Sequence, residues 1–213
     1  MDQHALSAPR FGLLRHGQTT WNRQKRIQGR ADSELTEQGL QDCRDWGGHL
    51  VGTSAFGSWE RIVCSPAPRA LRSAQIINEY LRLPLEEDYE LREMDWGLWE
   101  GLNISEINAA FPGERPAQIE RGWFFRPPRG ESRAEVRTRV LAALQRLSHT
   151  YPATSTLLVS HLGVIKALIY HIEKRDYLPG EANLLDNNRL HIIIGCDSAF
   201  GRGCYNLALP DNR

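Results

Sequence analysis

Histidine and arginine residues follow three apolar segments of this sequence, close to the point where each segment ends. The three segments are residues 11–14, 61–64 and 156–160. Arg15 and His16 follow the first, Arg69 follows the second, and His161 follows the third. A guanidinium offers planar, paired donors that fit a phosphate, and a neutral imidazole can act as a nucleophile or a donor. Together these residue types suit the binding and transfer of a phosphoryl group.

The spacing of these residues points to one site if the three segments are parallel strands of one sheet. Short, continuous apolar runs are typical of strands that are buried on both faces. Gly17, directly after the first histidine, lets the chain turn sharply and lets a ligand approach the backbone. Because ligands of open α/β sheets bind at the carboxyl ends of the strands, we expect the histidines and arginines to converge on a phosphate dianion.

Each of these residues also has an interpretation without function. A single histidine at a strand end, such as His161, is more often an ordinary surface or core residue than a catalyst. Arg69, in a first helical turn, could be solvated, although a cation at the positive end of a helix dipole favours a nearby anion. Glu93 and Asp95 could be plain surface acids. The functional interpretation therefore depends on the convergence of several residues.

Helices are expected between the strands. Thr36 is a typical N-cap residue, and the apolar positions within 40–50 fall on one helical face. Pro66 ends the second apolar run, and the residues 67–81 again have helical periodicity. Crossovers of this length allow parallel pairing of the strands. The predicted fold is therefore α/β, a three-layer αβα sandwich with a mostly parallel central sheet.

The second half of the chain is less regular. Asn103 with Glu106 is a capping pair that predicts a short helix ending near residue 111, and Ser132 with Glu135 predicts a longer helix. The residues 112–130 mix proline, glycine and arginine with three aromatic side chains, which indicates an irregular lid rather than packed core. Further expected elements are a helix over 164–172 and strands over 190–194 and 204–209. We find no linker, and expect one domain over 1–213 with the lid at about 95–130.

The composition excludes several classes of function. Lys plus Arg and Asp plus Glu both number 26, so the net charge is zero, and no long-range field attracts nucleic acid or an anionic membrane. No apolar run is long enough for a membrane span, and the first ten residues lack the apolar core of a signal peptide. The four cysteines have no C-x-x-C spacing that would indicate a zinc site. We expect a cytoplasmic protein that binds neither nucleic acid nor membrane.

The polar motifs occur in an order that resembles a known family. They are Arg15-His16-Gly17-Gln18-Thr19 with Asn22, Ser65-Pro66 with Arg69, Glu93 ahead of Gly97 and Trp99-Glu100-Gly101, and Ser160-His161 with Gly163. From near residue 11 to about residue 170 the sequence is similar to the histidine phosphatase superfamily, in its phosphoglycerate-mutase-like branch. Gln28-Gly29, Leu35-Thr36 and Gly130-Glu131-Ser132 extend the resemblance. It implies the phosphoglycerate-mutase-like form of the predicted sandwich.

The resemblance also implies a role for each site residue. His16 would attack the phosphoryl group and form a phosphohistidine. The phosphoryl oxygens would be held by Arg15, Arg69 and His161, with Asn22, Gln28 and the backbone at Leu162 as further phosphate-binding positions. Glu93 would protonate the leaving oxygen and then activate water. The expected catalytic residues are therefore His16, Glu93, His161, Arg15 and Arg69, with no metal and no cofactor.

Four positions depart from the commonest pattern of the family. Gln18 stands where glutamate is frequent, Ser73 where threonine is frequent and Lys166 where arginine is frequent. Leu162 replaces the first glycine after the second histidine. A bulky side chain at this position can narrow the pocket beside a phosphate-contacting amide, so Leu162 bears on the choice of substrate rather than on catalysis.

Three functions stay open at this stage. The first is a phosphomonoester phosphatase acting on a small phosphorylated metabolite, and the second is a phosphoglycerate mutase. The third is a catalytically silent module that binds phosphate. The segment 104–130 is shorter than the insert of the mutases, which favours the phosphatase, while its four arginines keep a second anionic group on the substrate possible; they are Arg115, Arg121, Arg126 and Arg129. The oligomeric state is open, with a homodimer as one alternative.

Overall fold

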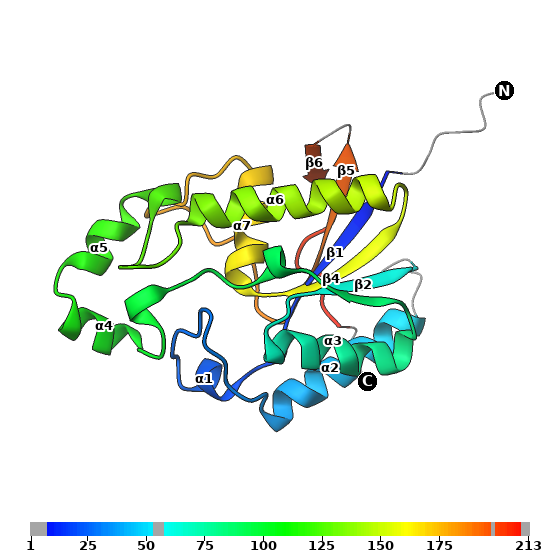
Figure 1. Cartoon of the computed structure of the whole chain (residues 1–213), viewed down its shortest axis with the longest axis horizontal. Coiled ribbons are helices and arrows are strands. Elements are labelled where there is room, and N and C mark those ends of the chain that lie inside the picture. Colours follow the sequence, from blue (N-terminus) through cyan, green and yellow to red (C-terminus); the bar gives the residue numbers. More distant parts are fainter. Residues whose placement is uncertain (1–7, 53–57, 197–198, 210–213) are drawn as a thin grey trace.

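A six-stranded sheet with the order β3-β2-β4-β1-β5-β6 runs through the centre of the molecule (Figure 1). The structure is a computed structural model that describes residues 8–52, 58–196 and 199–209. The strands are β1 Arg10–Arg15, β2 Arg61–Cys64, β3 Leu85–Glu87, β4 Ser155–Ser160, β5 Leu190–Cys196 and β6 Ala199–Arg202. The first four are parallel in the sheet, while β5 and β6 run antiparallel to their neighbours. The prediction of a mostly parallel sheet is confirmed.

The register between β1 and β4 brings the two histidine motifs to the same edge of the sheet. Arg15, the last residue of β1, is opposite Ser160, the last residue of β4. The backbone N–H of His16 then donates to the carbonyl of Ser160 at 2.9 Å. His16 and His161 therefore leave two neighbouring parallel strands side by side.

Helices cover both faces of the sheet and complete the predicted three layers (Figure 1). One face packs against α2 Glu37–Gly52 and α3 Pro68–Leu81, and the other against α6 Arg133–Thr150 and α7 Leu162–Ile172. The shorter helices are α1 Thr20–Arg23, α4 Ile104–Ala110, α5 Glu114–Ile119, and the 3-10 turns η2 Tyr89–Leu91, η3 Gly97–Trp99 and η4 Gly122–Phe124. No helix in the described ranges is long and apolar enough to cross a membrane.

The two faces of the sheet are filled by alternate residues of the same strands. Phe11 and Leu13 of β1 belong to the core under α6 and α7, whereas Leu14 belongs to the core under α2 and α3. Leu158 and Val159 of β4 divide in the same way. Because successive side chains of a strand point to opposite faces, a continuous apolar run is what a doubly covered strand requires.

The helix starts expected from capping pairs are present. Asn103 and Glu106 form a capping box at the start of α4, which ends at Ala110. Ser132 and Glu135 form another at the start of α6. In both boxes the two residues exchange side-chain to backbone hydrogen bonds, so the first free N–H groups of the helix are satisfied.

The segment 112–130 is more ordered than the sequence suggested, and the interpretation of its aromatic residues as lid rather than core is partly wrong. It contains α5 and η4, and Phe125 is only 3% exposed. The Phe125 ring lies edge-on to Trp96 and Trp99, with ring centroids 5.6 and 5.8 Å apart. Phe124 is 68% exposed and does belong to the surface. Of these two neighbouring phenylalanines, Phe125 therefore anchors the segment in the core.

The strand expected over 204–209 is not formed. The last strand is β6, which pairs with β5 before this segment. Asn206 has a φ of 56°, in the left-handed region, which interrupts an extended chain. Leu207 keeps a single isolated bridge to Leu190 and packs against the core from there. The apolar residues of this segment are thus used for packing and not for a strand.

Candidate active site

The two histidines of the predicted site lie next to each other. The ring centroids of His16 and His161 are 5.1 Å apart, and the planes are inclined by 60°. Both side chains are buried, with exposed fractions of 5% and 0%. We call Arg15, His16, Arg69 and His161 the phosphate cradle, after the role that the sequence predicts for them.

Hydrogen bonds orient both imidazole rings. The Nδ1 atom of His16 is 2.8 Å from the carbonyl oxygen of Gly17, so Nδ1 carries the proton and Nε2 keeps its lone pair. The Nε2 atom of His161 is 2.8 Å from the hydroxyl of Ser65, which itself accepts from the N–H of Ala67. The Nδ1 atom of that ring is buried and has no hydrogen-bond partner among the described residues.

Gly17 and Ser73 fix the turn that carries His16. The N–H of Gly17 donates to the hydroxyl of Ser73 at 3.0 Å, and that hydroxyl donates to the carbonyl of Arg69 at 2.7 Å. A Cβ atom at residue 17 would lie 2.5 Å from the carbonyl oxygen of Gly39, too close for any side chain. The turn after β1 is thus tied to α3 and requires glycine.

Arg69 is a buried cation and not a solvated one, since only 2% of the residue is exposed. Its Nη1 donates to the carboxylate of Asp32 at 2.6 Å and to the carbonyl of Ala31 at 2.8 Å. Nη2 donates to the carbonyl of Gly29 at 2.9 Å. The loop around residues 29–32 therefore supplies the acceptors that a buried guanidinium needs.

Glu100 holds the same loop from the other side. Its carboxylate accepts from the N–H groups of Arg30 and Ala31, at 2.6 and 3.2 Å. Gly29 has a φ of 57°, and a Cβ there would lie 2.1 Å from the Glu100 Oε1 atom. The Gln28-Gly29 and Glu100 motifs, which are far apart in the sequence, thus form one structural unit beneath Arg69.

Glu93 reaches the site at the N-terminus of α7. Its Oε2 accepts from the N–H of Gly163 at 3.2 Å, and its Oε1 accepts from the N–H of Met94 at 2.8 Å. A Cβ at residue 163 would lie 2.3 Å from Oε1. Glycine at this position therefore lets the carboxylate come close to the helix end that carries His161.

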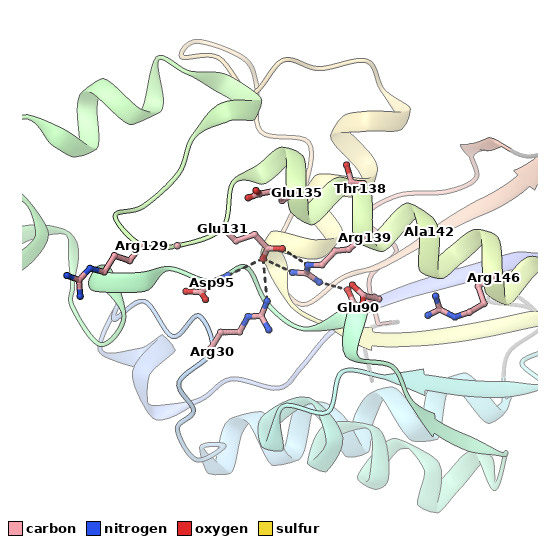
Figure 2. Close-up of a pocket in the computed structure, with 11 residues that line it drawn as sticks. Arg30, Glu90, Asp95, Arg129, Glu131, Glu135, Thr138, Arg139, Ala142 and Arg146 are labelled. Carbon is pink, nitrogen blue, oxygen red and sulfur yellow. Dashed lines mark hydrogen bonds and ion pairs between the residues drawn. The ribbon is translucent and has the colours of Figure 1, made fainter.

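A charged network around Arg139 and Glu131 lines a cavity of about 690 Å³ (Figure 2). Arg139 of α6 donates to the backbone carbonyls of Arg92 and Glu93, at 2.8 and 3.3 Å. The Glu131 carboxylate accepts from Nε and Nη2 of Arg139, at 2.7 and 3.0 Å. Arg30 lies 3.6 Å from the same carboxylate. This network ties the Glu93 backbone and the loop under Arg69 to α6.

The charges around this cavity of about 690 Å³ are balanced. Its lining contains the cations Arg30, Arg129, Arg139 and Arg146 and the acids Glu90, Asp95, Glu131 and Glu135. Its innermost pair, Arg139 and Glu131, is satisfied by direct contacts, as Figure 2 shows. We therefore interpret this region as support for Glu93 and not as a ligand site.

A separate cavity of about 310 Å³ opens over the phosphate cradle. The predicted site residues in its lining are Arg15, His16, Asn22, Gln28, Arg69, Glu93 and Leu162. His161 is fully buried beside His16 and completes the group. All the residues expected to act together are thus brought together by the fold.

The neutral members of the group are held by local contacts. The Oδ1 atom of Asn22 accepts from the N–H of Thr19 in the capping box of α1, so its amide NH₂ is the part that can donate to a ligand. Gln28 is buried and accepts a 3.4 Å hydrogen bond from Ser33.

Sequence reasoning missed part of the lining. Arg133, Tyr177 and Arg26 also line the cavity, as does Lys166, one of the four positions that depart from the family pattern. No local pattern marks them, because they come from helices and a loop whose meeting depends on the whole fold. The four arginines that kept a second anionic group on the substrate possible, Arg115, Arg121, Arg126 and Arg129, are not part of this lining.

Burial and positive charge keep both histidines neutral. Desolvation, followed by the charges of Arg15 and Arg69, holds the pKa of His16 well below its ordinary value. Desolvation is also the main reason that the pKa of His161 is lowered. A neutral imidazole is the form that can act as a nucleophile. Across the described residues, no group of three or more His, Cys, Asp or Glu side chains could hold a metal ion.

Known proteins share this sequence and geometry. A model of the histidine phosphatase superfamily (branch 1) matches residues 11–200. An uncharacterized phosphatase of Bacillus subtilis, PhoE, is 34% identical over 164 residues, which are 77% of each chain. A probable phosphoglycerate mutase of Salmonella typhi, GpmB, is 34% identical over 70% of this chain and 67% of its own. A bifunctional protein of Mycobacterium tuberculosis is also 34% identical, but the match spans 43% of it.

Solved structures agree. YhfR of Bacillus stearothermophilus superposes with a TM-score of 0.84 at 30% identity, over 94% of this chain and 98% of its own. A mycobacterial glucosyl-3-phosphoglycerate phosphatase superposes with a TM-score of 0.80 at 29% identity, over 93% and 99%. The resemblance seen in the motifs is confirmed.

The lowered pKa of His16 predicts a pH dependence of stability. Unfolding returns this pKa to about 6.5, so below that pH the unfolded state binds the extra proton and the free energy of unfolding falls as the pH falls. Replacing His16 by Asn should reduce the slope between about pH 6 and pH 5 by about 1.4 kcal/mol per pH unit. Urea unfolding at several pH values in phosphate-free buffer measures this slope of the free energy of unfolding.

The control for this experiment is His149→Gln, which removes an exposed histidine at the end of α6. Equal slopes for the wild type and His16→Asn would contradict the assignment of a buried, neutral His16.

Proposed function

The chain belongs to the histidine phosphatase superfamily, and from that premise we propose that it hydrolyses phosphomonoesters of small metabolites through a phosphohistidine on His16. The observation that carries the proposal is the cavity over the phosphate cradle. It brings two neutral histidines, two arginines and Glu93 around one volume of about 310 Å³. That volume lies at the lower end of the range for small-molecule sites.

In the first step the Nε2 lone pair of His16 attacks phosphorus in line with the ester oxygen. The N–P bond forms as the P–O bond breaks, and the proton stays on Nδ1, which donates to the carbonyl of Gly17. Arg15 and Arg69 offset the charge of the phosphoryl oxygens, and the buried Nδ1 of His161, which has no partner among the described residues, serves in its protonated tautomer as a further donor to them. Glu93, in its acid form, gives its proton to the leaving oxygen.

In the second step Glu93 is a carboxylate and accepts a proton from a water molecule. The water oxygen attacks phosphorus as the N–P bond breaks, and inorganic phosphate and neutral His16 are released. The contact between Glu93 and Gly163 at the start of α7 supports this role, because it keeps the carboxylate beside the cradle in both steps.

A phosphoglycerate mutase is the second candidate, favoured by relatives that carry that name. In a mutase the phosphoryl group passes from histidine to a hydroxyl of the bound acid instead of to water. The same residues serve both reactions, and the difference is whether water reaches the phosphohistidine. We favour hydrolysis because the segment 104–130, which contains α4 and α5, is shorter than the insert of the mutases.

Replacing His16 by Ala should abolish release of phosphate from p-nitrophenyl phosphate, with a loss of at least about a thousandfold in kcat. His149→Gln, which also removes an imidazole but lies outside the cavity, should retain activity. Full turnover in His16→Ala would refute the nucleophile. A wild type that turns over none of a broad panel of phosphoesters would favour the silent phosphate-binding module.

Replacing Arg139 by Met should lower kcat by about ten- to a hundredfold with a small change in KM, because the backbone carbonyls of Arg92 and Glu93 each lose a hydrogen bond and a shift of about 1 Å is costly. The matched control is Arg146→Met, on the same helix, which breaks an exposed ion pair with Asp88. If both variants lose activity in proportion to their loss of thermal stability, Arg139 has no positioning role.

The balance between hydrolysis and phosphoryl transfer can be measured on one sample. With 3-phosphoglycerate as substrate, we expect phosphate release to exceed formation of the 2-phospho isomer. Simultaneous phosphorus NMR of both products provides the ratio. Faster isomerisation than hydrolysis would reverse our order of the two functions.

A further inference from the structure

The Ser65 hydroxyl lies against the phosphate cradle but has no part in the reaction proposed above. Ser65 follows β2 directly, and its N–H donates to the carbonyl of Val159 in β4 at 3.0 Å. This backbone contact holds Ser65 beside the strand that ends just before His161. The residue is 0% exposed, so its hydroxyl does not reach bulk solvent. A buried hydroxyl of this kind is expected to be paired within the protein.

Two contacts involve this hydroxyl. The backbone N–H of Ala67 donates to it at 3.2 Å, and the Nε2 atom of His161 lies 2.8 Å from it. Along the part of the chain that the structure describes, the Ser65 oxygen has no third partner. Because a backbone N–H can only donate, the contact with Ala67 uses one of the two lone pairs of the oxygen. The direction of the bond between Ser65 and His161 is then decided by the pairing of the remaining groups.

One tautomer of His161 leaves two buried groups unpaired. A neutral imidazole carries a single N–H, on either Nε2 or Nδ1. If Nε2 carries the proton, it donates to Ser65, and the hydroxyl proton of Ser65 has no acceptor among the described residues. The buried Nδ1 atom of His161 then has no donor either. Each unpaired group has lost its water without a replacement, which is unfavourable.

The other tautomer leaves only one group unpaired. Here the hydroxyl of Ser65 donates to Nε2, so Ser65 uses its donor and one lone pair, and Nε2 is paired as well. The Nδ1–H of His161 is the single donor without a partner within the described ranges. Its ring packs against His16, with ring centroids 5.1 Å apart, and it experiences the charges of Arg15 and Arg69. An unpaired donor among cations is suited to an anion.

We propose that Ser65 is a positioning residue that selects the tautomer of His161. By donating its hydroxyl proton to Nε2, it keeps the imidazole proton on Nδ1, where it can donate to an oxygen of the phosphoryl group. This inference rests on the phosphatase function proposed above and extends it to a residue that does not touch the substrate. No proton is transferred, because the O–H bond of Ser65 and the N–H bond of His161 both stay intact throughout the reaction.

The two histidines of the cradle are in this way fixed in the same tautomer for different purposes. The carbonyl of Gly17 accepts from Nδ1 of His16 and leaves the Nε2 lone pair for attack on phosphorus. The hydroxyl of Ser65 donates to Nε2 of His161 and leaves the Nδ1–H for binding. An acceptor beside one ring and a donor beside the other therefore assign the nucleophile and the phosphate donor.

NMR tests the tautomer without any turnover. Long-range proton–nitrogen correlation spectra distinguish the protonated from the unprotonated ring nitrogen, and the variant His161→Gln identifies the signals of His161. In the phosphate-free wild type we expect the proton on Nδ1. In Ser65→Ala we expect the Nε2–H form to be populated, because the donor to Nε2 is lost, and Ser65→Thr should restore the Nδ1–H form because it keeps a hydroxyl.

A proton on Nε2 in the wild type would overturn the proposal, and this measurement requires no variant of Ser65. The same tautomer in the wild type and in a folded Ser65→Ala would overturn it as well. A purely structural role of Ser65 predicts that outcome, since lost packing lowers stability without moving a proton from one ring nitrogen to the other.

Binding of inorganic phosphate is the second measurement. Calorimetric titration should give a dissociation constant about tenfold higher for Ser65→Ala than for the wild type, and one within about twofold of the wild type for Ser65→Thr. The matched control is Ser148→Ala, which removes a hydroxyl of α6 that has no partner in the described segments and lies outside the cavity. It should bind phosphate as the wild type does. Equal affinity in the wild type and Ser65→Ala contradicts the proposal.

Hydrolysis of p-nitrophenyl phosphate separates this inference from the proposed function. If the wild type hydrolyses the ester but carries the His161 proton on Nε2, Ser65 has no positioning role and the phosphatase function stands. If the proton is on Nδ1 and moves in Ser65→Ala while no ester is turned over, the selection of the tautomer stands and the phosphatase function is wrong.

Discussion

The burial of positive charge at the carboxyl edge of the sheet is the constraint on which the rest of the structure depends. Arg69 is almost fully enclosed, and a buried guanidinium is stable only if acceptors surround it. Asp32 and two carbonyls of the neighbouring loop supply them. That loop in turn needs Gly29 and the carboxylate of Glu100 to adopt its shape. The loop at Arg30 and the carboxylate of Glu100, 70 residues apart in the sequence, are therefore held together around the buried charge of Arg69.

The same concentration of charge sets the state of the histidines. His16 stays neutral because adding a proton beside Arg15 and Arg69 in a desolvated site is unfavourable. The arrangement thus combines an uncharged imidazole, the state that the proposed nucleophile requires, with cations that suit a dianion. Close backbone approach is the second requirement, since the turn at Gly17 and the contact of Glu93 with Gly163 leave no space for a Cβ atom.

The sequence allowed the fold and the cradle to be predicted because both follow from local signals. Buried parallel strands are continuous apolar runs, and the residues after them must meet at one edge, which placed His16 and His161 correctly. Residues 204–209 were misjudged because a left-handed residue at Asn206, invisible in an apolar pattern, interrupts the extended chain. Arg133 and Tyr177 could not be predicted, since only the packing of α6 against α7 and the following loop brings them to the cavity.

In the proposed function, chemistry and specificity are carried by different parts of the molecule. The proposed reacting groups His16 and His161 follow strand ends whose positions are fixed by the register of β1 and β4. The opposing wall comes from α6, α7 and the loop of Tyr177, and its shape does not alter that register. Two departures from the common family pattern, Leu162 and Lys166, lie one turn apart on this wall, while a third, Ser73, keeps a hydrogen bond to the turn of His16. We therefore expect substitutions on this wall to change which leaving group fits while the register that positions His16 is kept.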